Sequence, residues 1–333
     1  MRKGRTAAAV GTALVAGAVA RRVRARGLAS RMSGSGPAVH TDDGVRLHVE
    51  VHGPADAPVT VLFSHGFATR SAVYDQQWTA LRGRARLVRY DQRGHGASGW
   101  AGVRSAGVDR LGRDLEQVVD ELAGDTPVVV VGHSMGGMAV LALAGRRPEL
   151  FGTRITGVAL LSTRAAPLPG TGSSSGGQDR VRAGLAAAGA WLLWLVAPAI
   201  GAVQPFRSRP GRRLLRRQLF TEAASEDDVR TMSRWWTETP TGVLTAYLTS
   251  LVTYDQRPAI DALRAVPVLV LAGTADRTIP PDSAPRLARQ LGERARLVLV
   301  DGAGHMVNVT HAATVDAALD DLLSRSQPEH SSR

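Results

Sequence analysis

The chain of 333 residues contains no cysteine. A thiol nucleophile, a disulfide framework and a cysteine-ligated metal site are therefore excluded. The sequence has no excess of charged residues: they make up 21% of it, and hydrophobic residues make up 44%. These proportions are typical of a globular protein, and the length allows one or two domains with a large buried core.

Acidic residues are absent before Asp42, although eight arginines and lysines lie within residues 1–31. A second basic cluster runs from Arg207 to Arg217 in a chain whose net charge is +12. No nucleic-acid-binding motif accompanies either cluster, and each adjoins an apolar stretch. An anionic membrane surface, contacted through residues 1–31 and 184–217, therefore explains the clusters better than nucleic acid does. A solvated arginine-rich face is the alternative.

Residues 6–20 form an uncharged stretch with basic residues on both sides. This stretch is shorter than the roughly 20 residues that cross a bilayer as a helix. Ala18-Val19-Ala20 resembles the cleavage site of a secretory signal, but the arginines that follow at once oppose translocation. We therefore expect an anchor or interfacial helix that holds the protein at a membrane on the cytoplasmic side, with export as the alternative.

Beyond residue 38, short runs rich in Val, Ile and Leu alternate with helical patterns. The predicted strands cover residues 45–51, 59–63, 87–90, 128–131, 155–161, 266–271 and 296–300. Most of these runs are apolar throughout, as parallel strands covered on both faces are. The repeated alternation of strand and helix predicts an α/β fold with right-handed crossovers.

The alternation stops between residues 163 and 254, where helical patterns follow a Gly/Ser-rich tract. We interpret this segment as a helical cap inserted into the sheet domain. The sequence therefore predicts an N-terminal segment over 1–36, a core over 37–163 and 255–325, a cap over 164–254 and a tail over 326–333.

The strongest motif for chemistry is Gly132-His133-Ser134-Met135-Gly136, between an apolar strand and an apolar helix. This G-x-S-x-G arrangement is typical of a nucleophile elbow, in which the serine stands clear of its strand on a sharp turn. Gly132 and Gly136 remove the Cβ atoms that such a turn would crowd. Ser134 is therefore the candidate nucleophile.

A serine needs a base to become an effective nucleophile. His305 follows the last predicted strand in a glycine-rich loop, and Asp276 occupies the equivalent place after the preceding strand. Loops at these strand ends share one edge of a parallel sheet, where α/β proteins build their sites. We therefore predict His305 as general base and Asp276 as the residue that orients it.

Acyl transfer also needs hydrogen-bond donors for the developing oxyanion. The candidates are the backbone N–H groups of Met135, which follows the nucleophile, and of Phe67, in the loop after residues 59–63. The Phe67 side chain is expected at the pocket wall. His133 is expected to point away from Ser134, and His95 to be a structural loop residue. No residue pattern suggests a metal site.

Residues 184–203 form a 20-residue run without a charge, long enough to span a bilayer. A span there would place Ser134 on one side of the membrane and Asp276 and His305 on the other. The run is therefore expected to line an apolar substrate pocket or to lie at a membrane surface without crossing it.

The segments 64–67, 90–99, 132–137, 273–280 and 302–305 resemble, in order and spacing, the motifs of α/β-hydrolases related to monoacylglycerol lipases and bacterial esterases. The resemblance implies an eight-stranded, mostly parallel sheet with helices on both faces, a cap inserted after strand 6 and no cofactor. The serine argues against the epoxide hydrolases and haloalkane dehalogenases of this fold, which use an aspartate nucleophile.

The sequence thus predicts a serine hydrolase that cleaves a carboxylic ester with an apolar acyl group, such as a monoacylglycerol, through an acyl-enzyme. The same triad serves C–C bond hydrolysis, perhydrolysis and acyl transfer, which remain alternatives. A non-catalytic ligand-binding member of the fold is a further alternative. Neither the alcohol part of the substrate nor the oligomeric state follows from the sequence.

Overall fold

The computed structural model describes residues 37–166, 208–252 and 254–327. The predicted N-terminal anchor over residues 6–20, the apolar run over 184–203 and most of the tail lie outside the described residues. Among the described residues, no helix is both long and apolar enough to cross a membrane.

Eight strands of the described chain form one sheet, in the order β1-β2-β4-β3-β5-β6-β7-β8. The pairs β1–β2 and β2–β4 are antiparallel, and the remaining pairs are parallel. The strands are β1 (Ala38–His40), β2 (Arg46–His52), β3 (Thr60–Ser64), β4 (Arg86–Tyr90), β5 (Val128–His133), β6 (Ile155–Leu161), β7 (Val268–Gly273) and β8 (Ala295–Val300). The predicted mostly parallel, eight-stranded sheet is confirmed, although the short β1 left no clear pattern in the sequence.

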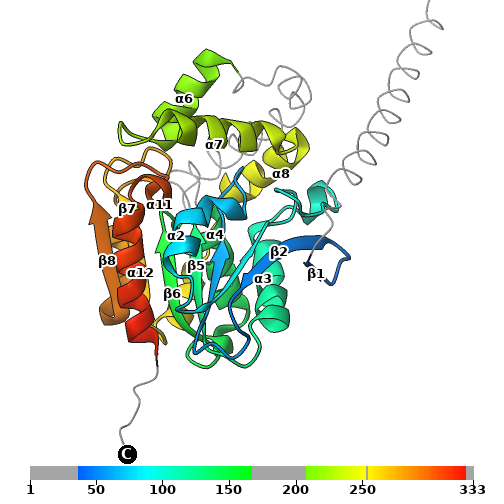
Figure 1. The fold of residues 1–333 in the computed structure, drawn as a ribbon, viewed down its shortest axis with the longest axis vertical. Helices are drawn as coiled ribbons and strands as arrows, with labels where there is room; N and C mark the ends of the chain where they lie inside the picture. Colours follow the sequence, from blue (N-terminus) through cyan, green and yellow to red (C-terminus); the bar gives the residue numbers. More distant parts are fainter. Residues whose placement is uncertain (1–36, 167–207, 253, 328–333) are drawn as a thin grey trace, which may run out of the picture.

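Helices cover both faces of the sheet (Figure 1). Successive side chains of a strand point to opposite faces, and the central strands carry apolar side chains on both. Val128 and Val130 of β5 pack into the apolar layer under one set of helices, and Val129 and Val131 pack into the layer under the other set. The first set comprises α3 (Val108–Leu122), α4 (Met135–Arg146), α9 (Ile260–Leu263) and α10 (Ser283–Leu291). The second set comprises α2 (Asp75–Ala80), α11 (Val307–Thr310) and α12 (Ala312–Ser326).

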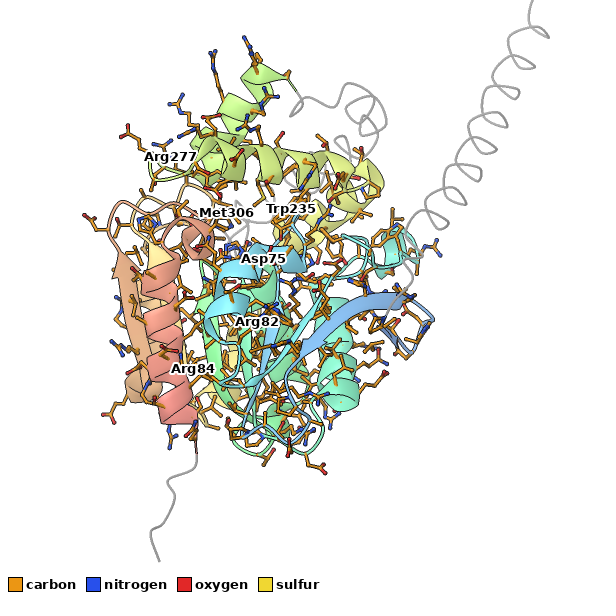
Figure 2. The ribbon with its side chains drawn as sticks, in the orientation of Figure 1. Asp75, Arg82, Arg84, Trp235, Arg277 and Met306 are labelled. Atoms are coloured by element: carbon orange, nitrogen blue, oxygen red, sulfur yellow. The ribbon has the colours of Figure 1, made fainter. Side chains whose placement is uncertain are left out.

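Three further helices, called here the inserted helices, lie between β6 and β7 in the chain: α6 (Arg209–Leu219), α7 (Glu226–Glu238) and α8 (Thr241–Val252). Figure 1 shows them grouped above the end of the sheet where α11 lies. Leu219 and Trp235 share one apolar cluster with Met306 of the core, and Figure 2 shows Trp235 and Met306 where α7 faces the core. The cap boundaries 164–254 stay a prediction, because part of that range is not described.

One buried ion cluster ties the antiparallel edge of the sheet to α3. The Arg93 side chain is 0% exposed, and its guanidinium donates to Asp114 at 2.5 and 2.7 Å and to Asp43 at 2.8 and 3.0 Å. The hydrogen bonds from Arg93 hold the pKa of the Asp43 carboxyl well below its ordinary value. The loop after β4, the turn after β1 and α3 therefore meet at this single guanidinium.

We expect Arg93→Met to lower the free energy of unfolding by about 3–5 kcal/mol, because the buried Asp114 would keep only Arg110, at 3.1 Å, as counter-charge and Asp43 would lose its two-pronged partner. The matched control is Arg230→Met, which removes an exposed arginine paired only with the exposed Asp227 at 2.7 Å. Arg230→Met should lower the free energy of unfolding by less than about 1 kcal/mol. Urea denaturation of both variants measures the difference, and equal losses would contradict the role given to Arg93.

Candidate active site

Ser134 occupies the turn between β5 and α4 with φ 52° and ψ −116°, a conformation that residues with a side chain rarely adopt. The turn brings the start of α4 against the β3 loop. A Cβ on Gly136 would lie 1.9 Å from the Ser64 carbonyl oxygen, and one on Gly132 would lie 2.7 Å from the Gly136 and Gly137 backbone. Both glycines are therefore required by the packing of the elbow.

Three loops at the carboxyl ends of parallel strands bring Ser134, His305 and Asp276 together. His305 Nε2 lies 3.0 Å from Ser134 Oγ, and His305 Nδ1 lies 2.8 Å from Asp276 Oδ2. The side chains are almost completely buried, with residue exposures of 8%, 4% and 4% in the order Ser134, His305, Asp276. With its proton on Nδ1, the His305 ring can accept the Ser134 hydroxyl proton at Nε2.

The Asp276 carboxylate is fixed from both sides. Its Oδ1 accepts hydrogen bonds from the N–H groups of Thr278 at 2.7 Å and Ile279 at 2.9 Å, while Oδ2 faces His305. Burial on its own raises the pKa of the Asp276 carboxyl, but the His305 ring and the two N–H groups outweigh it. The pKa therefore lies below its ordinary value, and Asp276 is ionised near neutral pH.

The sequence suggested that His133 points away from Ser134, but its ring lies close to the His305 ring. Its ring lines the same cavity, 4.9 Å from the His305 ring between centroids, and its Nε2–H donates to the His305 carbonyl oxygen at 2.9 Å. Burial lowers the pKa of His133 to about 3. The ring is thus neutral, and it holds the loop that carries His305.

The loop after β3 lies beside Ser134. A Cβ on Gly66 would come within 3.3 Å of the Ser134 Cβ, so only a glycine lets Phe67 follow so closely. His65 Nε2 accepts from the Gln92 N–H at 2.8 Å, and His95 Nε2 accepts from the Ala68 N–H at 3.2 Å. These two buried rings fix the loop in place, which agrees with the structural role expected of His95.

One proposed oxyanion donor, Met135, directly follows Ser134 in the chain, and the other, Phe67, follows Gly66, which packs against Ser134. Met135 is the first residue of α4, so its N–H has no partner within the helix. The Phe67 ring stands against Trp236 of α7, 5.5 Å away between centroids, and both line the cavity. Phe67 is therefore at the pocket wall, as the sequence suggested.

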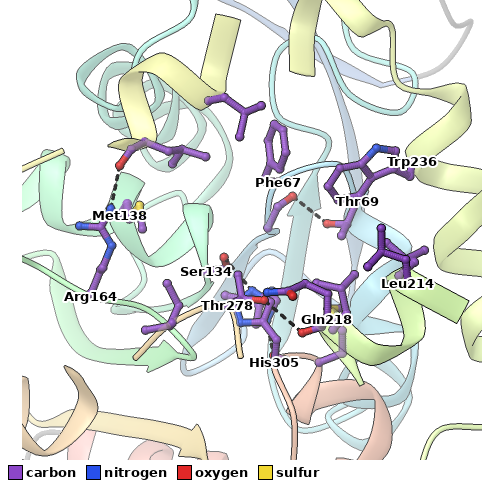
Figure 3. A pocket seen from close by; sticks show the side chains of 18 residues that line it. Phe67, Thr69, Ser134, Met138, Arg164, Leu214, Gln218, Trp236, Thr278 and His305 are labelled. Atoms are coloured by element: carbon purple, nitrogen blue, oxygen red, sulfur yellow. Dashed lines mark hydrogen bonds between the residues drawn. The ribbon is translucent and has the colours of Figure 1, made fainter. Parts of the chain in front are cut away.

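A cavity of about 410 Å³ opens onto Ser134 and His305 (Figure 3). Its remaining walls come largely from the inserted helices and are apolar: Leu214, Leu215, Leu219, Trp236, Leu248 and Leu251. Leu214 is 60% exposed and lies where the cavity meets solvent. Sequence reasoning missed Arg164, which also lines the cavity. A signal was present, because Arg164 follows the apolar strand β6 at the functional edge of the sheet.

Among residues 37–166, 208–252 and 254–327, no group of three or more His, Asp or Glu side chains is placed to hold a metal ion. The side chains that meet at the elbow are a serine hydroxyl, an imidazole and a carboxylate.

Residues 55–309 match the protein family described as serine aminopeptidase, S33. The chain belongs to this family of α/β-hydrolases. It is 30% identical to a bifunctional esterase/perhydrolase of Acinetobacter calcoaceticus over 84% of this chain and 97% of that protein. It is 29% identical to a putative carbamate hydrolase of Variovorax paradoxus over 84% of this chain and 96% of that protein. The resemblance suggested by the sequence motifs is confirmed, and the protein is a hydrolase.

Solved structures support the fold. A thermophilic esterase from Thermogutta terrifontis superposes on this hydrolase with a TM-score of 0.69 at 22% identity, covering 88% of this chain and 99% of that chain. An enol-lactonase from Burkholderia xenovorans superposes with a TM-score of 0.68 at 24% identity, covering 86% and 100%. The eight-stranded architecture is thus shared across hydrolases with different substrates.

The elbow packing predicts how the glycines respond to substitution. Gly136→Ala should cost about 3 kcal/mol or more, because the added Cβ meets the Ser64 backbone, which cannot move aside as a side chain would. The matched control is Gly242→Ala in α8, where a Cβ would have no neighbour within 4 Å. The control should be neutral or stabilising by up to about 1 kcal/mol. Thermal and urea denaturation compare the two, and a Gly136→Ala variant as stable as the control would refute the elbow geometry.

Proposed function

We propose that this hydrolase cleaves carboxylic esters with an apolar acyl group through an acyl-enzyme, with Ser134 as nucleophile. The observation that carries the proposal is the hydrogen-bonded row from Ser134 Oγ through His305 to Asp276, at the floor of an apolar cavity. A nucleophile, a base in contact with it and a group that orients the base are the parts that acyl transfer needs.

In the first half-reaction, Ser134 Oγ attacks the ester carbonyl carbon while His305 Nε2 takes the hydroxyl proton. The C–O bond to the alcohol then breaks, and His305 returns that proton to the departing alkoxide. In the second half-reaction, water attacks the acyl-enzyme with His305 again as base, which releases the carboxylic acid and restores Ser134. Asp276 stays ionised throughout and stabilises the imidazolium that forms twice in the cycle.

The N–H groups of Met135 and Phe67 are the proposed oxyanion donors. Losing one such donor costs about 3 kcal/mol of transition-state stabilisation. The close approach of Gly66 to the Ser134 Cβ supports this assignment, because Phe67 is the next residue in the chain. The positive end of the α4 dipole favours the same negative charge.

The inserted helices, as the proposed cap over the elbow, supply the apolar walls that favour a lipid-like or small apolar acyl group, of which a monoacylglycerol is one example. Perhydrolysis is the second candidate reaction, favoured by the relative named an esterase/perhydrolase. It uses the same acyl-enzyme, with hydrogen peroxide in place of water as the second nucleophile. Comparing peracid with acid formation in hydrogen peroxide separates the two reactions.

Ser134→Ala should abolish labelling by a fluorophosphonate probe and lower kcat for p-nitrophenyl esters by a factor on the order of 10⁶. The fold should survive, because the alanine keeps the Cβ at the turn. The control is Ser105→Ala, a serine in the loop before α3 that bonds only the nearby Gly102 carbonyl. The assignment is wrong if Ser134→Ala retains labelling, or if the wild-type protein neither labels nor hydrolyses any ester of the panel.

The basic helix α6 motivates a further proposal, contact with an anionic membrane. Arg209, Arg213 and Arg217 are exposed on this helix, and the exposed Leu214 lies at the rim of the cavity. Such a surface would bring the cavity mouth to the lipid interface, where apolar esters are concentrated. Residues 1–31 are the proposed second contact.

The double substitution Arg213→Gln/Arg217→Gln should weaken binding to phosphatidylserine-containing vesicles about 30-fold, since each arginine near the surface contributes about 1 kcal/mol. The charge-matched control is Arg82→Gln/Arg84→Gln, at the amino end of β4 and away from α6 (Figure 2). Vesicle sedimentation measures the lipid binding of both double variants and of a third protein that lacks residues 1–31. If the two double variants bind alike, α6 is not a membrane contact.

A further inference from the structure

Arg164 is a buried cation held in a fixed place beside the nucleophile. It follows β6 by a short turn in which Ser162 has φ 45°, and Thr163 Oγ1 donates to the Ser134 carbonyl oxygen at 2.8 Å. The Arg164 residue itself is only 4% exposed, yet its side chain lines the cavity (Figure 3). The backbone that presents the guanidinium is thus anchored to the backbone of Ser134.

The guanidinium of Arg164 has no carboxylate partner within ion-pair distance in the described part of the chain. It donates to the main-chain oxygens of Ala166 and of Leu251, the latter at 2.7 Å, and it lies 5.5 Å from the Tyr254 ring centroid. Its Nε is buried and meets no acceptor among the described residues. Asp255 acts on it only from farther away, since that carboxylate is engaged by Arg257 at 2.5 Å.

Other buried arginines of this protein are compensated. Arg93 meets Asp114 and Asp43, and Arg89 meets Glu50 and Asp75. Burial lowers the pKa of Arg164, but a guanidinium stays protonated near neutral pH. A charge buried without a counter-ion is unfavourable, so its place in a cavity calls for a ligand that supplies the opposite charge.

The described walls of the cavity offer no other permanent charge to provide that compensation. The described residues that line it include no Asp, Glu or Lys. In Figure 3, Arg164 and Met138 lie on one side of Ser134, while Leu214 and Trp236 lie on the other. The cavity therefore offers a cation on one side of the reacting serine and apolar surface on the other.

We propose that Arg164 binds an ionised carboxylate of the substrate, so that the preferred esters carry a carboxylate on one side of the scissile bond and an apolar chain on the other. The guanidinium N–H groups not used by Ala166 and Leu251 are the donors for this anion, and such charge-assisted bonds are stronger than neutral ones. The inference rests on the proposed ester hydrolysis at Ser134 and names the class of ester that the site takes.

The test compares esters matched in size. Monohexyl glutarate carries the carboxylate in its acyl part, and hexyl hexanoate replaces that carboxylate by an ethyl group. The hexanoyl ester of 4-hydroxybutanoate places the carboxylate in the alcohol part instead. Wild-type enzyme should hydrolyse one of the two anionic esters with a kcat/KM about 10- to 100-fold above that of hexyl hexanoate, the range expected of one charged hydrogen-bonded contact.

Arg164→Met keeps an unbranched stem at this position and removes the guanidinium and its charge. It should lose most of the preference for the anionic ester, chiefly through a higher KM, so that kcat/KM falls by a larger factor for the anionic ester than for hexyl hexanoate. Arg164→Lys should retain part of the preference, because an ammonium keeps the charge without the guanidinium fork. A purely structural role, through the Ala166 and Leu251 carbonyls, would instead lower the rates on both esters equally.

Failure of this inference is distinguishable from failure of the proposed function. Binding of the same anionic ester to Ser134→Ala, measured by calorimetry, does not depend on turnover, and Arg164→Met added to that variant should abolish it. No wild-type preference, or a preference and binding that survive Arg164→Met, overturns the role of Arg164 while leaving ester hydrolysis standing. No turnover of any ester, with anion binding that requires Arg164, overturns the hydrolysis and leaves the anion site.

Discussion

The close approach between the start of α4 and the loop after β3 is the constraint on which the site depends. Gly136 lies against the backbone of Ser64, and Gly66 lies against the side chains of His133 and Ser134. The approach forces Ser134 into a positive φ and leaves the first N–H groups of α4 beside the hydroxyl. A strained residue held by surrounding packing is typical of functional positions. Ser134, the proposed nucleophile, is therefore placed by the core rather than by a loop that could relax.

The rest of the site is assembled around that fixed point by the sheet and by the inserted helices. Because β5, β7 and β8 run parallel, the loops that follow them open at one edge, and Asp276 and His305 reach Ser134 there. The end of α6 is tied to the same loops, since the Met306 N–H donates to the Leu219 carbonyl oxygen at 3.2 Å. The wall of the cavity and the loop that carries His305 are thus parts of one packed unit.

Two buried arginines illustrate opposite uses of the same side chain. Arg93 is fully surrounded by carboxylates of its own chain and joins three segments of the fold. Arg164 faces a cavity without a carboxylate partner in the described chain, so its charge remains available to something that enters. An arginine that is paired with carboxylates of its own chain stabilises the fold, whereas an arginine without such a partner is available to bind a ligand. Both arginines follow strands of the central sheet, and sequence position alone does not distinguish them.

The sequence by itself determined the α/β fold, the order of the strands along the chain and the candidate row of Ser134, Asp276 and His305. These follow from local signals, since apolar runs, glycine spacing and loops after strands act over a few residues. The short β1, the neutral His133 beside His305 and the exposure of Arg164 to the cavity were decided only by the tertiary structure. Each depends on which residues distant in the chain pack around it, because burial, pairing and the absence of a counter-ion are properties of neighbours brought together by folding.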